Sequence, residues 1–203
     1  GDGPNELLGR LGGLPTVIAF ECSGFSNVIN ADFVQPDNRM VAEFAIGHLQ
    51  GCRNIAVISN EPLHNAVIER ACEFMSMSEK LEFKASRFVE DSTLGAMIKR
   101  IFKGKNRPDG IFIPVGDMAV VEACTALRQM GLKPVDDVKI IACCNDPGYM
   151  WTSDSRIPNI DIRPDAIGQA AAEILLQRIK NPSEEFRRIL VRPRLQSPVS
   201  SFQ

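Results

Sequence analysis

The sequence is poor in histidine and in aromatic residues. It contains two histidines, one tryptophan and one tyrosine in 203 residues. Neither His48 nor His64 is accompanied by a nucleophile in a G-x-S-x-G turn. The sequence also contains no G-x-G-x-x-G or G-x-x-x-x-G-K-[ST] phosphate-binding loop. It therefore gives little support to an enzyme, and we expect no catalytic residues and no cofactor.

The sequence also lacks an excess of charge and a long apolar run. Its net charge is −2 and its pI is about 5.8, which argues against a surface built for nucleic acid or acidic membranes. No apolar run approaches the roughly 18 residues of a membrane span. The first residues lack the charged start and apolar centre of a signal peptide. A mature secreted chain would lack one too, so secretion stays open at this point.

The cysteines do not form a metal-binding or disulfide pattern. Six are present, none at the close spacing of a zinc site, at positions 22, 52, 72, 124, 143 and 144. Cys143 and Cys144 are adjacent at the end of an expected strand, so their side chains point to opposite faces and cannot easily share a metal. A chain that is 44% hydrophobic does not need disulfides. We expect most of these thiols to be core residues in a reducing cytoplasm, with no bound metal.

Short apolar runs alternate with helical segments along the whole chain. The strands are expected at 15–21, 28–34, 54–59, 81–89, 109–115, 137–144, 159–162 and 186–195. Helices are expected at 5–11, 37–51, 63–77, 92–104, 117–131 and 165–181, with Asp37, Ser92 and Asp165 as N-caps. This alternation predicts an α/β fold with parallel sheets connected by helical crossovers.

Polar residues follow three of the expected strands. Ligands of open parallel sheets bind beyond the carboxyl ends of the strands. The candidate binding residues there are Asp37, Asn38, Gly116, Asp117, Cys144, Asn145 and Asp146. The alternative is that Asp37 and Asp117 only cap the helices that they precede. The two roles are compatible, because a carboxylate can accept hydrogen bonds from both.

Several segments, in order, resemble the effector-binding domain of the lactose/galactose repressor family, which is similar to periplasmic sugar-binding proteins. The segment that carries most of the resemblance is "DGIFIPVGDMAVVEACTALRQMGLKPVDDVKIIACCND". "LPTVIAF", "VQPDNRMVAEFAIGHLQGCRNIAVIS" and "IPNIDIRPDAIGQAAAEILLQRI" match other family segments. The resemblance covers roughly residues 5–198. Within the family, "CNDPGYMWTSDSRIPNI" is most similar to the xylose-operon regulators.

The resemblance implies two Rossmann-like lobes with parallel sheets, the type I periplasmic binding protein fold. The expected N-terminal lobe is 1–52 plus 157–184, and the expected C-terminal lobe is 53–156 plus 185–203. The crossovers would fall near 51–54, 155–158 and 182–186. The resemblance also implies that the first lobe lacks its initial strand–helix units, and that a helix-turn-helix DNA-binding segment lies outside this chain, before or after it.

The resemblance assigns ligand contacts to several residues. Asp37 matches the family acid at the start of a helix, and Arg70 matches the arginine of the family pattern R-x-x-G-F. Gly116 replaces a family asparagine, and Cys144 replaces a family acid. Two polar contacts are therefore missing, which puts sugar specificity in question.

Arg70 also has a purely structural interpretation. Instead of binding a ligand, its guanidinium can pair with Glu69 or Glu73, or with Asp91 across the loop. A planar guanidinium suits vicinal hydroxyls or a carboxylate equally well.

The resemblance implies a ligand-sensing domain of a transcriptional regulator. It would bind a sugar or a similar small metabolite between the lobes and so modulate the binding of operator DNA. We expect a cytoplasmic homodimer with no membrane partner. The alternatives are a secreted solute-binding protein of a sugar transporter and, with less support, a sugar-modifying enzyme.

Overall fold

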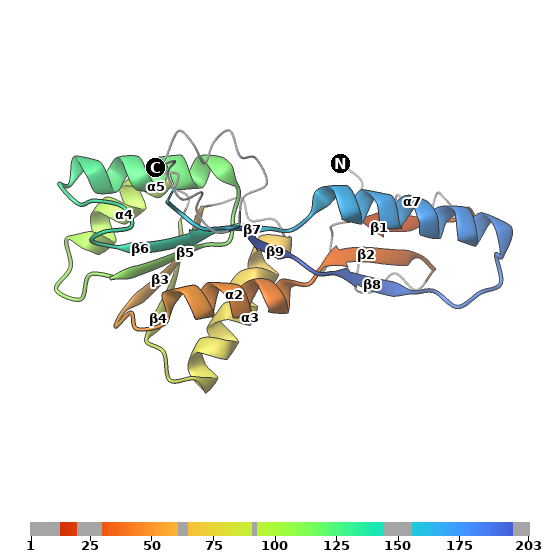
Figure 1. Ribbon diagram of the computed structural model, residues 1–203, viewed down its shortest axis with the longest axis horizontal. Coiled ribbons are helices and arrows are strands. Elements are labelled where there is room, and N and C mark those ends of the chain that lie inside the picture. The colour runs from red at the N-terminus through yellow and green to blue at the C-terminus, as the bar shows by residue number, and fades with distance from the viewer. Residues whose placement is uncertain (1–12, 20–29, 61–64, 91–92, 144–155, 197–203) are drawn as a thin grey trace, which may run out of the picture.

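The computed structural model contains two β-sheets with helices packed against them (Figure 1). It describes residues 13–19, 30–60, 65–90, 93–143 and 156–196. The two sheets lie one after the other along the longest axis of the molecule. The chain passes between them at three places: between Pro36 and Asn38, between Asp161 and Pro164, and between Val191 and Arg194.

The larger sheet has six strands in the order β4-β3-β5-β6-β7-β9. All neighbours are parallel except β7 and β9. The strands are β3 (Ile55–Asn60), β4 (Ala85–Glu90), β5 (Gly110–Ile113), β6 (Lys139–Ala142), β7 (Asn159–Asp161) and β9 (Arg194–Gln196). Buried runs such as β5 and the end of β6 are typical of a parallel sheet that is covered on both faces.

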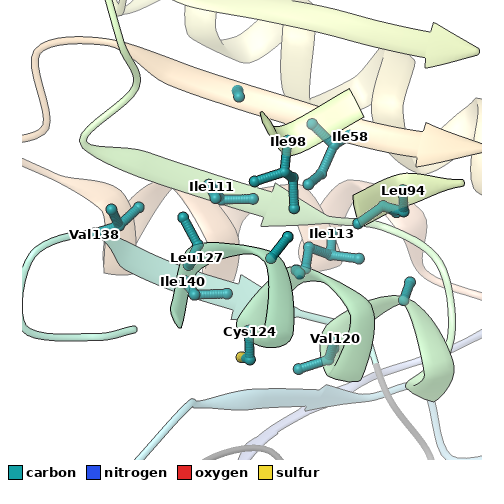
Figure 2. Packing of buried hydrophobic residues seen from close by; sticks show 14 of the residues in the cluster. Ile58, Leu94, Ile98, Ile111, Ile113, Val120, Cys124, Leu127, Val138 and Ile140 are labelled. Carbon is teal, nitrogen blue, oxygen red and sulfur yellow. The ribbon is translucent and has the colours of Figure 1, made fainter. Parts of the chain in front are cut away.

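Helices cover both faces of the larger sheet. Alternate side chains of β3 point to opposite faces, so Ile55 and Val57 join one core and Ala56 and Ile58 join the other. The first core includes α2 (Asn38–Leu49) and α3 (Asn65–Lys80). The second includes α4 (Leu94–Phe102) and α5 (Asp117–Gln129) and is shown in Figure 2.

The smaller sheet has three parallel strands in the order β1-β2-β8. They are β1 (Val17–Ala19), β2 (Asp32–Pro36) and β8 (Arg188–Val191). Helix α7 (Pro164–Lys180) packs against this sheet, and its Ile167 and Ile174 share a core with Val34 and Val191. The α/β fold with parallel sheets expected from the sequence is therefore confirmed.

A buried ion pair holds the smaller sheet to its helix. The Arg178 guanidinium at the end of α7 donates to both carboxylate oxygens of Asp32, from Nε to Oδ2 at 2.9 Å and from Nη2 to Oδ1 at 3.1 Å. The side chain of Arg178 is 3% exposed and that of Asp32 is fully buried. Arg178 also donates to the carbonyls of the loop before β8, at Pro182, Glu184 and Glu185. The pair therefore joins a strand, a helix end and a loop.

The two sheets divide the chain differently from the lobes expected from the sequence. Helix α2, expected in the first lobe, packs against α3 and β6 of the larger sheet. Strand β7 pairs with β6 and β9 of the larger sheet, whereas β8 pairs with β2 of the smaller one. The reason is that each crossover directly follows a strand, so the next element already belongs to the other sheet.

Two expected helix caps also differ. The N-cap of α4 is Thr93, whose hydroxyl accepts from the Ala96 N–H at 3.3 Å, while Ser92 lies outside the described residues. Helix α7 begins at Pro164 with Arg163 as its N-cap, so Asp165 lies inside the first turn. Asp37 caps α2 as expected: its Oδ1 accepts from the Met40 N–H at 3.0 Å. The expected helix at 5–11 lies outside the described residues.

Candidate functional site

The start of α2 lies at the carboxyl edge of the larger sheet. A short loop joins the end of α2 to the start of β3, so the helix runs antiparallel to the strand and its N-terminus reaches the strand's far end. The half-buried Asp37 sits at that N-terminus. Its backbone N–H donates to the Val191 carbonyl, at the end of β8, at 3.0 Å. Asp37 therefore lies where two of the three crossovers meet.

Asn38 and Arg70 form a buried polar network behind Asp37. The Arg70 Nε donates to the Asn38 Oδ1 at 3.0 Å, and its Nη1 donates to the Pro114 carbonyl, just after β5, at 3.1 Å. The Asn38 Nδ2 in turn donates to the Glu69 Oε2 at 2.6 Å. Arg70 is 7% exposed and Asn38 is 4% exposed. The network ties α2, α3 and the end of β5 together at one edge of the sheet.

These contacts decide part of the question that the sequence left open about Arg70. Among the described residues its partners are Asn38 and a backbone carbonyl, and it forms no ion pair with Glu69 or Glu73. Asp91, the third alternative, lies outside the described residues. The guanidinium is thus fixed in orientation by two neutral acceptors and keeps its full positive charge for a further partner.

The end of β6 brings Cys143 to the same network. The thiol is buried, and its backbone N–H donates to the Ile113 carbonyl at 2.9 Å. Burial raises the pKa of Cys143 to about 11, although the positive charge of Arg70 opposes this rise. Cys143 is therefore a neutral thiol at ordinary pH. The chain continues to Cys144, Asn145 and Asp146, three of the candidate residues, which lie outside the described residues.

Gly116 and Asp117 mark where β5 leads into α5. Gly116 is the N-cap of α5, is exposed, and makes no side-chain cap. A Cβ built on it would meet nothing within 4 Å. Packing around the Cβ position therefore does not require glycine here. Asp117 is the first residue of α5.

Ser59 is a buried residue at this edge that the sequence reasoning missed. It lies near the end of β3, on the face that carries Ile55 and Val57 and so on the side of α2 and α3. Its hydroxyl is buried and has no hydrogen-bond partner among the described residues. A buried hydroxyl without a partner costs free energy. A serine at the end of an otherwise apolar strand was the available signal.

Metal and membrane sites find no support in the described residues. No group of three or more histidine, cysteine, aspartate or glutamate side chains in the described part of the chain could hold a metal ion. None of the described helices is long and apolar enough to cross a bilayer. The described cysteines form no disulfide among themselves: Cys124 and Cys143 are buried as expected, Cys52 is half-buried, and Cys72 is exposed. Cys72 is therefore an exception to the expected core thiols.

Comparison with known proteins places this geometry in a family. The model of the periplasmic binding protein-like domain matches residues 46–197. The HTH-type transcriptional repressor PurR of Klebsiella pneumoniae subsp. pneumoniae is 29% identical over 177 residues, covering 81% of this chain and 51% of the relative. The chain thus spans about half the length of the curated relatives that it matches. These relatives are named as repressors rather than as enzymes.

Solved structures of LacI family regulators share the fold. A LacI family transcription regulator from Clostridium acetobutylicum has a TM-score of 0.80 at 21% identity, covering 97% of this chain and 75% of that one. A LacI family transcriptional regulator from Enterococcus faecium with bound ribose has a TM-score of 0.75 at 18% identity, covering 97% and 76%. Since the family model matches more than half of the chain, the protein belongs to the family of periplasmic binding protein-like domains.

Proposed function

We propose that this chain is the effector-binding domain of a transcriptional regulator, and that it binds a sugar or a similar small metabolite between its two sheets. Of the described residues, those before position 37 and those at 162–191 would form one lobe, and the rest would form the other. These lobes follow the sheets rather than the boundaries expected from the sequence. The supporting observation is the buried Asn38–Arg70 network, which holds a cation at the carboxyl edge of the larger sheet.

The residues at this edge of the larger sheet would supply the ligand contacts. Arg70 would donate to hydroxyls or to an acidic group, and Asn38 would hold the guanidinium in place. Asp37 would accept from a ligand hydroxyl while it caps α2. Gly116 and Asp117 would contact the ligand beyond the end of β5. Cys144, Asn145 and Asp146 stay contacts that are predicted from the sequence alone. The loss of a side chain at Gly116 favours a ligand with fewer polar groups on that side.

Ligand binding would act through the geometry of the two sheets. A ligand that contacts both sheets binds one arrangement better than another and shifts the equilibrium towards it. The relatives named as helix-turn-helix repressors support a readout through operator DNA, by a segment outside this sequence. They also support a cytoplasmic regulator over a secreted solute-binding protein. The particular likeness to xylose-operon regulators stays a prediction.

The experiment that tests this proposal is calorimetric titration of the full chain with a panel of neutral sugars that includes ribose and cellobiose, which regulators of similar fold bind. We expect at least one sugar to bind. A charged or charge-assisted hydrogen bond contributes roughly 1.5–3 kcal/mol. Arg70→Ala should therefore weaken binding by about tenfold or more.

The matched control is Arg39→Ala, which removes an exposed arginine of α2 that pairs with Glu43. Its affinity should equal that of the unchanged protein. Equal affinity in Arg70→Ala would show that Arg70 is structural, and no binding across the panel would refute a sugar effector.

We also propose that the intact protein is a homodimer, because closed twofold assemblies are the commonest among soluble oligomers. Sedimentation of the full-length protein at micromolar concentration tests this. A monomer there would contradict the proposal.

A further inference from the structure

A cavity of about 350 Å³ opens at the opposite end of the larger sheet from the candidate effector site. Asn54 and Ile55 lie at the start of β3 and Lys84 directly precedes β4, so the cavity is at the amino ends of these strands. The C-terminal part of α4 and the loop after it close the other side. Its lining residues are Asn54, Ile55, Lys84, Ser86, Phe88, Arg100, Ile101, Gly104, Asn106 and Pro108.

The lining combines an apolar wall with positive charge. Phe88, Ile101 and Pro108 supply the apolar surface, and Phe88 is an aromatic ring on the edge strand of the sheet. Asparagine and serine side chains supply neutral polar groups, while Lys84 and Arg100 supply two cations. No carboxylate is among the lining residues. A volume of this size is within the range of small-ligand sites.

Four further cations stand next to lining residues in the sequence. Arg53 precedes one lining residue, and Lys103, Lys105 and Arg107 alternate with Gly104, Asn106 and Pro108 in the loop after α4; all four are exposed. Neither these side chains nor that of Lys84 forms an ion pair or hydrogen bond with the residues that the structure describes. The whole chain has a net charge of −2, so this concentration of cations is local.

Two described acidic residues close in sequence, Asp109 and Glu82, do not pair with Lys84 or with these four cations. Asp109 follows the lining residue Pro108, but its carboxylate accepts from the backbone N–H groups of Arg53 at 2.9 Å and Asn54 at 2.8 Å. Glu82 is exposed two residues before Lys84 and forms no ion pair with it among the described residues. Lys84 therefore lines the cavity without an ion pair among the described residues.

A simpler explanation accounts for only part of this charge. Cations in the last turn of a helix interact favourably with its C-terminal dipole, and Lys99 and Arg100 occupy the last turn of α4. Lys84 is not on that helix, because it precedes β4 on the opposite wall of the cavity. Helix stabilisation therefore does not explain why a lysine faces the same space from the sheet.

We propose that this cavity binds a small organic anion in which a carboxylate or phosphate is attached to a ring or a short apolar group. The apolar part packs against Phe88 and Ile101, and the anionic group binds Lys84 and Arg100 at the rim. The site is separate from the effector site, since it lies at the other end of the same strands. A ligand here contacts the larger sheet alone.

The test uses phenyl phosphate as the probe and nuclear magnetic resonance of isoleucine methyl groups in the full chain as the measurement. We expect the Ile101 methyl signals to shift, while those of Ile167 and Ile174 in the smaller sheet's core do not. Inorganic phosphate lacks the ring and benzyl alcohol lacks the charge, so both should bind more weakly. No shift at Ile101 with millimolar phenyl phosphate would overturn the proposal, as would equal binding of either partial probe.

Two lysine variants test whether phenyl phosphate binding depends on the charge at Lys84 or only on the net charge of the chain. Lys84→Gln should weaken phenyl phosphate binding by about fivefold, as expected for one partly exposed charge contact. Lys180→Gln removes an exposed charge from the last turn of α7 and should leave the affinity unchanged. Arg100→Gln is the second test on the helical wall. If both cavity variants keep a native methyl spectrum and full affinity, the proposal is wrong.

Discussion

Arg178 and Asp32 lie 146 positions apart in the sequence and form a buried ion pair in which the guanidinium reaches both carboxylate oxygens. The backbone N–H of Arg187 donates to the same carboxylate at 2.8 Å. The Arg178 guanidinium lies 4.4 Å from the centre of the Phe186 ring. The side chains of Asp32 and Arg178 thus hold together β2, the end of α7 and the loop before β8. A buried pair costs desolvation, but removing one partner costs more, because the other charge is left without compensation.

We predict that Asp32→Asn lowers the free energy of unfolding by about 3 kcal/mol, because it leaves Arg178 buried without an opposite charge. Urea unfolding followed by circular dichroism measures this. The control is Glu173→Gln, which removes an exposed carboxylate from α7, the helix that carries Arg178. It should change the free energy of unfolding by less than about 0.5 kcal/mol. Equal midpoints for the two variants would show that the pair does not stabilise the sheet.

The same pair should make stability depend on pH in the acid range. Burial by itself raises the pKa of Asp32, but the hydrogen bonds from Arg178 and the Arg187 backbone and the charges of both arginines outweigh it and lower the pKa below the ordinary 3.8. A carboxyl whose pKa is lowered by folding stabilises the protein above its unfolded pKa. That stability disappears as pH falls through the folded pKa.

The difference in unfolding free energy between the unchanged protein and Asp32→Asn should therefore be constant near neutral pH. It should shrink below about pH 4. Urea midpoints of both proteins across that range decide the matter. A difference that stays constant into acid would mean that Asp32 is not the group that titrates.

Thiol reactivity should separate the described cysteines in the native protein. We expect Cys72 to react with a thiol reagent first, because it is exposed on α3. Cys143 should react last, since it is buried and its pKa is raised to about 11. Timed labelling with mass spectrometry gives the order. After denaturation all six cysteines should titrate, and a lower count or stoichiometric zinc would contradict the prediction that the chain has no disulfide and no metal.

Two glycines should respond in opposite ways to substitution by alanine. A Cβ on Gly110, at the start of β5, would lie 2.8 Å from the Cys52 Sγ and 3.2 Å from the Leu49 Cδ2, so Gly110→Ala should destabilise the protein by about 1–3 kcal/mol. A Cβ on Gly116 meets no atom within 4 Å, so Gly116→Ala should be tolerated. Thermal unfolding compares the two.

Cys52→Ala tests the mechanism, because it removes the sulfur that comes nearest to the new methyl group. Gly110→Ala should cost less in that background than in the unchanged protein. The same cost in both backgrounds would place the strain elsewhere.

The order of strands and helices could be predicted from the sequence, because hydrophobic periodicity reports which side of an element is buried. It does not report which sheet an element joins. Helix α2 has the same amphipathic pattern whether it covers one sheet or the other, and β7 and β8 are too short for their neighbours to be read from composition. The lobe boundaries therefore differed from the observed sheets, although most elements were placed correctly.

In the candidate site, too, local features could be predicted from the sequence and contacts between distant residues could not. Asp37 was predicted as a cap from the residue type before a helix, and this local property is confirmed. The partners of Arg70 were not predicted, because Asn38 and Pro114 are brought to it only by folding. Asp32 in the expected strand "VINADFV" was the one signal of the buried pair, and its partner Arg178 stands in the helix expected at 165–181.

The hydrogen bond from the Asp37 backbone to the Val191 carbonyl has a consequence for motion. It fastens the first crossover to the third. In the second crossover the Asp161 carboxylate accepts from the Arg163 N–H at 2.7 Å, and Arg163 is held at a φ of 58°, in the left-handed region. The first and third crossovers are therefore connected by a hydrogen bond, and the second is stabilised by one of its own. We expect the three crossovers to act as a single hinge. A molecule bound between the sheets would then change one angle between them, and the crossovers would not move independently.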